Sequence, residues 1–131
     1  GLPEMSTHDG LAEKQKSNVV KIRVLHWGDK PAPITCLIGS PRFKSEFDHV
    51  ARALSQRGEI VMAPHIYSNG NGLDKEDTDL LHELALKRIE MADIVFVINP
   101  NNRTNDNVRN EISYAKSLDR TVLYLDTPAD D

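Results

Sequence analysis

Four short apolar runs, separated by longer amphipathic segments, are the feature that most constrains the fold of this chain. In chain order the runs read ITCLI, EIVMA, DIVFVI and TVLYL, and they fall between residues 34 and 125. Strands that are apolar on both sides are typical of a parallel sheet that helices cover on both faces. The alternation therefore predicts a three-layer α/β fold, Rossmann-like or flavodoxin-like, with four core strands in a parallel sheet.

The segments between these runs have the 3.6-residue periodicity of amphipathic helices. We predict a first helix that ends at Gly58, a second from about Thr78 to Ala92, and a third from Asn107 to Leu118. Glycine suits the left-handed conformation that commonly ends a helix. The inward-facing residues expected in the first two helices are Phe43, Phe47, Val50, Ala51 and Leu54, and then Leu81, Leu84, Ala85, Ile89 and Ala92.

Length and charge narrow the class of protein. The 131 residues fit one domain, which we place at residues 34–131 after an N-terminal tail of residues 1–33. With Lys+Arg 16 against Asp+Glu 20 the net charge is -4, and no basic run is present, so a polymeric nucleic-acid partner is disfavoured. No apolar run approaches the roughly 20 residues of a membrane span, and no signal-peptide pattern is seen. We therefore expect a cytoplasmic protein that makes no membrane contact.

One part of the tail has a strand pattern of its own. In the segment Val19 to Trp27, Val20, Ile22 and Val24 fall on one side of an extended chain. This alternation predicts an additional edge strand before the turn at residues 28–33.

In a parallel sheet, ligands bind in the crevice beyond the carboxyl ends of the strands. Polar and turn-forming residues collect at this predicted edge, namely Gly39, Ser40, Pro64, His65, Asn99, Pro100 and Asp126. The third helix begins beside the same edge, so side chains from its opening turns are expected to overhang the crevice. The pattern predicts a small-molecule site here.

The segment Gly39-Ser40-Pro41-Arg42 has two interpretations. Gly39 permits a tight turn, Ser40 is a good N-cap and Pro41 suits the first helical position, so the segment describes a well-capped helix. Alternatively, the free N–H groups at the helix start bind an anion, with Arg42 as a second donor. The local pattern leaves both interpretations open.

The connection that follows His65, residues 66–77, is long, glycine-rich and polar. Loops of this kind in compact domains are either lids over binding sites or solvated connections, and the sequence favours neither. Its Gly70-Asn71-Gly72 is not a dinucleotide fingerprint, because it neither follows directly on a strand nor opens a helix at the right spacing.

The residues present at key positions exclude several common kinds of metal, phosphorylation and nucleotide-binding sites. His82-Glu83 begins like a zinc-protease helix, but the position of the required second histidine is Leu86. Asn99 ends the third strand where a receiver domain needs an acceptor aspartate, and no glycine-rich segment ends in Lys-Ser or Lys-Thr. Cys36, the only cysteine, lies inside ITCLI and is interpreted as a core residue. We expect neither a metal nor a cofactor.

One carboxylate is out of place in the third predicted helix. The stripe of that helix that should face inward consists of Val108, Glu111, Ile112, Ala115 and Leu118. Burying an ionised carboxylate without a partner costs several kcal/mol or forces its protonation. In one interpretation an arginine neutralises Glu111, the candidates being Arg42, Arg88 and Arg109. In the other, Glu111 is a nucleophile or general base held at low dielectric.

Three segments carry a resemblance to a known family. They are IGSPRF at Ile38 to Phe43, MADIVFVINP at Met91 to Pro100, and NEISYAKSLDRTVLYL at Asn110 to Leu125. In this order and spacing they resemble the nucleoside 2-deoxyribosyltransferase-like family, which also includes nucleoside 5′-monophosphate N-glycosidases. The resemblance covers Ile34 to Asp126.

The resemblance implies an N-glycosidase or N-glycosyl transferase that acts on a nucleoside or nucleoside 5′-monophosphate. Glu111, within Glu111-Ile112-Ser113-Tyr114-Ala115, matches the family's nucleophile, which attacks the anomeric carbon and displaces the base. No metal or cofactor is implied. Relatives are usually dimers or higher oligomers in which a neighbouring subunit completes the pocket, so a homodimer or higher homo-oligomer is expected.

Substrate-binding positions follow from the same resemblance. The Gly39-Ser40 turn matches the segment that lines the sugar and base pocket. Residues 104–107, with Asn105 among them, match the region where relatives bind the sugar or its 5′-phosphate, and His65 matches a pocket residue of some relatives. Arg42 and Arg109 are candidate contacts for an anionic substrate.

One departure from the family pattern affects the chemistry. Relatives carry an aspartate on the second helix that positions the sugar or protonates the leaving base, and the matching residue here is Ala85. A methyl group can neither donate nor accept a proton, so the second group is missing or comes from His82, Glu83 or Asp79. The alternative function is therefore a non-catalytic nucleotide-binding or sensing module of the same fold.

Overall fold

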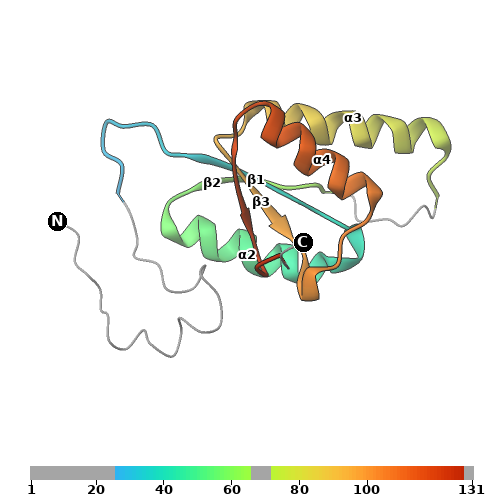
Figure 1. The fold of residues 1–131 in the computed structure, drawn as a ribbon. Helices are drawn as coiled ribbons and strands as arrows, with labels where there is room; N and C mark the ends of the chain where they lie inside the picture. The colour runs from blue at the N-terminus through green and yellow to red at the C-terminus, as the bar shows by residue number, and fades with distance from the viewer. Residues whose placement is uncertain (1–25, 66–71, 129–131) are drawn as a thin grey trace.

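The computed structural model describes residues 26–65 and 72–128. Its elements follow the predicted alternation of strands and helices (Figure 1). They are β1 (Ile34–Gly39), η1 (Pro41–Phe43), α2 (Lys44–Arg57), β2 (Ile60–Met62), α3 (Lys75–Met91), β3 (Ile94–Ile98), η2 (Pro100–Asn102), α4 (Asp106–Ser117) and β4 (Thr121–Tyr124). All four apolar runs form strands, which confirms that prediction. Most of the predicted edge strand, residues 19–25, lies outside the described residues.

The four strands form one parallel sheet in the order β2-β1-β3-β4. The fold class is therefore confirmed as a Rossmann-like or flavodoxin-like α/β fold. From β1 the chain first adds β2 on one side of β1, and it then crosses over to add β3 on the other side. The topological switch point of the sheet therefore lies between β1 and β3. Helix α2 covers one face of the sheet, while α3 and α4 lie together on the other (Figure 1).

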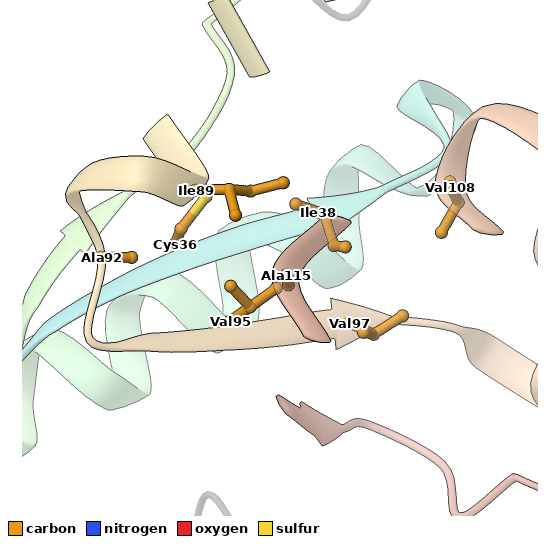
Figure 2. Close-up of a cluster of buried hydrophobic side chains, with 8 residues drawn as sticks. All are labelled: Cys36, Ile38, Ile89, Ala92, Val95, Val97, Val108 and Ala115. Atoms are coloured by element: carbon orange, nitrogen blue, oxygen red, sulfur yellow. The ribbon is translucent and has the colours of Figure 1, made fainter. Parts of the chain in front are cut away.

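Each face of the sheet has its own apolar core, which explains why the strands are apolar on both sides. The core under α2 contains Leu37, Phe43, Phe47, Val50, Leu54, Phe96 and Ile98. The core under α3 and α4 contains Cys36, Ile38, Ile89, Ala92, Val95, Val97, Val108 and Ala115 (Figure 2). One expected core residue is misplaced, because Leu84 is 42% exposed and turns toward the surface of α3.

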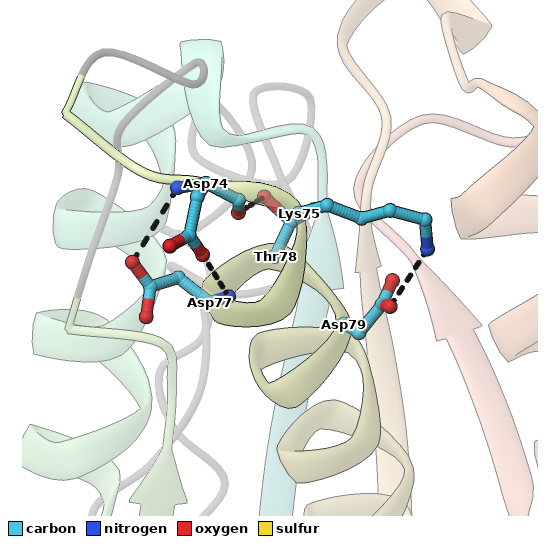
Figure 3. Close-up of polar contacts among 5 residues, drawn as sticks. All are labelled: Asp74, Lys75, Asp77, Thr78 and Asp79. Carbon is cyan, nitrogen blue, oxygen red and sulfur yellow. Dashed lines mark hydrogen bonds and ion pairs between the residues drawn. The ribbon is translucent and has the colours of Figure 1, made fainter.

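The helix ends follow local rules, although one boundary differs from the prediction. Gly58 ends α2 in the left-handed conformation, with φ 107°. Helix α3 begins at Lys75 rather than near Thr78, because Asp74 and Asp77 form a reciprocal capping box (Figure 3). Residues 75–77 are polar and carry no apolar periodicity, so the pattern missed this first turn.

At the amino ends of the strands, a second inward carboxylate is held by two partners. Glu59 precedes β2, and its side chain is only 6% exposed. The Thr35 hydroxyl donates to Glu59 Oε1 at 2.7 Å, and Arg57 lies 3.1 Å from Glu59 Oε2. A buried carboxylate satisfied in this way is a structural element that joins α2 and β2 to β1.

At the carboxyl ends of β3 and β4, polar side chains bond to one another and to the backbone. Asn99 is 2% exposed, and its Nδ2 donates to the Asp126 carbonyl oxygen at 2.9 Å. The Asp126 N–H donates back to Asn99 Oδ1 at 2.9 Å, while Asp126 Oδ2 accepts from the Asn101 N–H at 2.6 Å. Asn99 and Asp126, which the pattern placed at the ligand edge, thus tie the two strand ends together.

Candidate functional site

A pocket of about 450 Å³ lies beyond the carboxyl end of β1, where α3 and α4 overhang the sheet. Apolar walls come from Leu37, Ile38, Pro41, Pro64, Leu73, Leu81, Leu84, Ala85 and Val108. The polar side chains that line it are His65, Thr78, His82, Arg88, Asn105, Asn107 and Glu111. A largely apolar cavity of this size with a few convergent polar groups is typical of a small-molecule site.

Glu111 reaches the pocket from the inward stripe of α4, as the periodicity predicted. Val108 and Ala115, on the same stripe, are buried in the core, while Glu111 is half-buried at the pocket. Burial raises the pKa of Glu111 from 4.5 to about 7, and the positive charge of Arg88 opposes this rise. The carboxylate has no hydrogen bond or ion pair with any residue in the ranges 26–65 and 72–128.

Arg88 is the cation that acts on Glu111, and it comes from α3 rather than from α4 itself. It is half-buried and lines the same pocket, and its Nε has no partner within the described residues. Its charge also lowers the pKa of the Cys36 thiol, but burial dominates and raises that pKa to about 12. Cys36 is therefore a neutral core residue, as interpreted from the sequence.

The other two candidate cations are engaged elsewhere. Arg109 pairs with Asp106 and donates to Thr104 Oγ1 at 3.1 Å, so it is not part of the pocket lining. Arg42 stacks over the Phe43 ring, with its guanidinium carbon 4.9 Å from the ring centroid, and is exposed. Neither arginine neutralises Glu111, because both side chains are held outside the pocket.

The turn after β1 contributes Gly39 and Pro41 to the pocket wall, but not Ser40 or Arg42. Gly39 lines the pocket, and a Cβ there would lie 2.7 Å from the Ile98 carbonyl oxygen, so a side chain would clash. Ser40 is the N-cap of η1 and accepts weakly from the Arg42 N–H at 3.4 Å. Ser40 is absent from the lining, which favours the capping interpretation of this segment over the anion site.

Helix α3 supplies a wall that the sequence reasoning only partly anticipated. Six residues of this helix line the pocket: Thr78, Leu81, His82, Leu84, Ala85 and Arg88. Their spacing of three and four residues is a helical stripe, so polar residues on that stripe were the available signal. Ala85 is 8% exposed and replaces the expected carboxylate inside the pocket itself.

The three suggested substitutes for that carboxylate have different positions. His82 lines the pocket, and its Nε2 lies 3.2 Å from Asn107 Nδ2 on α4. Asp79 pairs with Lys75 on the exposed side of α3, at 2.8 Å (Figure 3). Glu83 is exposed and absent from the lining. Only His82 therefore has access to a bound ligand.

Of the other predicted site residues, His65 and Asn105 line the pocket. Asn105 is the N-cap of α4, where its Oδ1 accepts from the Val108 N–H at 2.9 Å. Within the described ranges, no group of three or more His, Cys, Asp or Glu side chains is arranged to hold a metal ion. No helix among the same residues is long and apolar enough to cross a membrane.

Comparisons with known proteins add no assignment. No family model matches the chain, and no curated protein is similar to it in sequence.

Proposed function

We propose that this protein cleaves or transfers the N-glycosidic bond of a nucleoside or nucleoside 5′-monophosphate, with Glu111 as the nucleophile. The observation that carries the proposal is a half-buried carboxylate that lines a small-molecule pocket and has no hydrogen-bond or ion-pair partner among the described residues. Holding a charge there destabilises the fold, and structural carboxylates avoid this by pairing. The family that the sequence motifs resemble uses a carboxylate at this position as the nucleophile of its reaction.

The proposed reaction has two displacements. Glu111 Oε attacks the anomeric carbon, the bond from that carbon to the base nitrogen breaks, and a glycosyl ester forms. Water, or a second base in a transfer reaction, then attacks the same carbon and releases the carboxylate. A pKa near neutrality keeps part of Glu111 ionised at physiological pH, while low dielectric makes the carboxylate reactive.

The rest of the pocket suits such a substrate. Leu73, Leu81 and Leu84 offer apolar contact to a planar base, and the Asn105 and Asn107 amides are able to bind sugar hydroxyl groups. Arg88 brings a positive charge, which favours the anionic 5′-monophosphate over the neutral nucleoside.

A panel of ribonucleosides, deoxyribonucleosides and their 5′-monophosphates tests the proposal. We expect release of free base from at least one of them, and its loss in the Glu111→Gln variant. Glu83→Gln is the matched control, because it makes the same chemical change at an exposed carboxylate outside the pocket. Failure to cleave any member of the panel, or equal turnover by Glu111→Gln, excludes the catalytic function.

One observation favours a second candidate function, a non-catalytic nucleotide-binding module. Ala85 occupies the pocket position where the resemblance expects a carboxylate, so the pocket could bind a nucleotide without cleaving it. Calorimetry separates the two candidates. Saturable heat of nucleotide binding with no base released after long incubation supports the binding module.

We also propose that the protein forms a homodimer through the exposed face of α3. Leu80, Leu84 and Met91 lie on one stripe of this helix and are 52%, 42% and 63% exposed. Because Leu84 also lines the pocket, a second subunit packed on this stripe would extend the pocket wall. Light scattering should report a dimer for the parent and a monomer for Leu80→Lys with Met91→Lys. Ile60→Lys, at an exposed residue of β2, is the control.

A further inference from the structure

The proposed reaction needs a proton for the departing base, and Ala85 cannot supply one. An unprotonated purine or pyrimidine anion is a poor leaving group, so positioned acids contribute substantially to such cleavage. The inference below rests on the proposed function and concerns the group that takes over this task.

His82 lies one turn before Ala85 on α3, on the face of the helix that lines the pocket. Residues three apart on a helix are neighbours on its surface, so the exposed His82 side chain lines the pocket wall next to the buried Ala85. Imidazole is also the side chain whose charge ordinarily changes between pH 5 and 8, which suits it to both donate and accept a proton.

The second helix of the pocket holds the imidazole in place. Asn107, in the first turn of α4, approaches His82 Nε2 with its amide at 3.2 Å. A rotated amide presents an oxygen in place of the NH2 group, so Asn107 can bind Nε2 in either protonation state of the ring. The contact leaves His82 Nδ1 free of Asn107 and available to a ligand.

We propose that His82 is the general acid that protonates the leaving base. As the bond from the anomeric carbon to the base breaks, its electron pair stays on the base, and the proton on His82 Nδ1 passes to a base nitrogen or oxygen. Neutral base and neutral imidazole result, and Glu111 carries the glycosyl ester. In the second step the neutral imidazole takes a proton from the attacking water, which restores the imidazolium and the carboxylate.

Several charged or titratable groups lie near His82. The titratable or charged residues that share the pocket with it are His65 from the β2 end, Arg88 from α3 and Glu111 from α4. Two others lie nearby on its own helix, Asp79, which pairs with Lys75, and exposed Glu83. Catalysis then requires an ionised Glu111 and a protonated His82, so the rate should fall at both acidic and alkaline pH.

The test compares His82→Ala and His82→Gln on the best substrate of the panel. Glutamine keeps a side chain that can bond to Asn107 but cannot deliver a proton. Both variants should lose roughly 10²–10⁴-fold in kcat/KM, as for removal of a general acid, and both should lose the alkaline limb of the pH–rate profile. His49→Ala, at an exposed position of α2, is the control and should keep the parent profile.

Leaving-group chemistry gives an independent readout when the best substrate is a purine nucleotide. Its N7-methylated counterpart carries a base that departs without protonation, so in single-turnover measurements of base release both His82 variants should cleave it within about 3-fold of the parent rate.

Three results would overturn the role of His82. They are retained activity in both variants, rescue by glutamine, and an alkaline limb that persists. If the parent cleaves no nucleotide at all, the proposed function fails and the inference fails with it. If the parent cleaves and the variants behave in any of those three ways, only the inference fails.

Discussion

Two carboxylates turn inward in this protein, at opposite ends of the sheet, and they are treated in different ways. Glu59 at the amino ends of the strands has a hydroxyl donor in Thr35 and an ionic partner in Arg57. Glu111 at the carboxyl end of β1 has neither kind of partner among the described residues, and burial raises its pKa to about 7. Inward position alone therefore does not mark a functional carboxylate. A functional role is indicated when an inward carboxylate lines a pocket and has no hydrogen-bond or ion-pair partner.

The largest expected difference between the two residues is in activity. Glu111→Gln should reduce kcat by roughly 10³–10⁶-fold, as for loss of an enzymatic nucleophile, because an amide cannot form the glycosyl ester. Glu59→Gln should keep the parent kcat per folded molecule, because it lies at the far end of the strands. Base release measured under single-turnover conditions checks both variants. Similar losses in the two would remove the distinction.

The next effect concerns stability and its dependence on pH. Because the folded-state pKa of Glu111 is raised, the folded protein binds its proton more tightly than the unfolded chain. The stabilisation that this tighter proton binding gives the fold is fully present below pH 4.5 and is lost as the pH rises through about 7. A shift from 4.5 to about 7 corresponds to roughly 3 kcal/mol.

Glu111→Gln removes this titration. Its free energy of unfolding should match that of the parent near pH 4 and exceed it by roughly 3 kcal/mol at pH 8. Urea denaturation at the two pH values measures the difference. A gap between variant and parent that does not change with pH would show that Glu111 is not desolvated.

Replacing Glu59 should change the free energy of unfolding by less than replacing Glu111 does, and in the opposite direction. Glu59→Gln weakens a charge-assisted contact and leaves Arg57 without its carboxylate, so the free energy of unfolding should fall by about 2 kcal/mol. Urea denaturation at pH 7 gives the value, and Glu83→Gln at an exposed position of α3 serves as the control. A stabilised Glu59→Gln would mean that its pairing does not offset its burial.

The smallest expected effect is a shift of the pH–rate profile when Arg88, the cation beside Glu111, is replaced. Arg88 lowers the pKa of Glu111, so Arg88→Met should move the acidic limb of the pH–rate profile to higher pH. Arg109→Met is the matched control, because Arg109 pairs with Asp106 away from the pocket. An equal shift in both variants would indicate a general charge effect rather than the Arg88 contact.

Local patterns predicted much of this fold because strands and helices leave their periodicity in the chain. The four apolar runs, the Gly58 cap and the inward position of Glu111 are all such features. The misses also have local causes. Lys75 to Asp77 form a helical turn fixed by capping rather than by apolar spacing. Leu84 has a core-like sequence position but lies at the rim of α3.

The candidate site was predictable only in part. Gly39, His65, Asn105 and Glu111 line one pocket, as the shared sheet edge suggested, whereas Ser40, Arg42 and Arg109 do not. The sequence suggested Arg88 only as a charge partner of Glu111, and it suggested Asn107 only as part of the substrate-binding region at residues 104–107. Both enter the site through the packing of α3 against α4, which no short stretch of sequence encodes.

By itself, the sequence determined that a carboxylate in NVRNEISYAKSL would face the interior, because helical periodicity is a local property. Only the tertiary structure decided which cation lies near it. Arg109, two residues before Glu111, projects to a different side of the helix and pairs with Asp106. Arg88 and His82 come from another helix, and their place beside Glu111 depends on how α3 and α4 pack over the sheet.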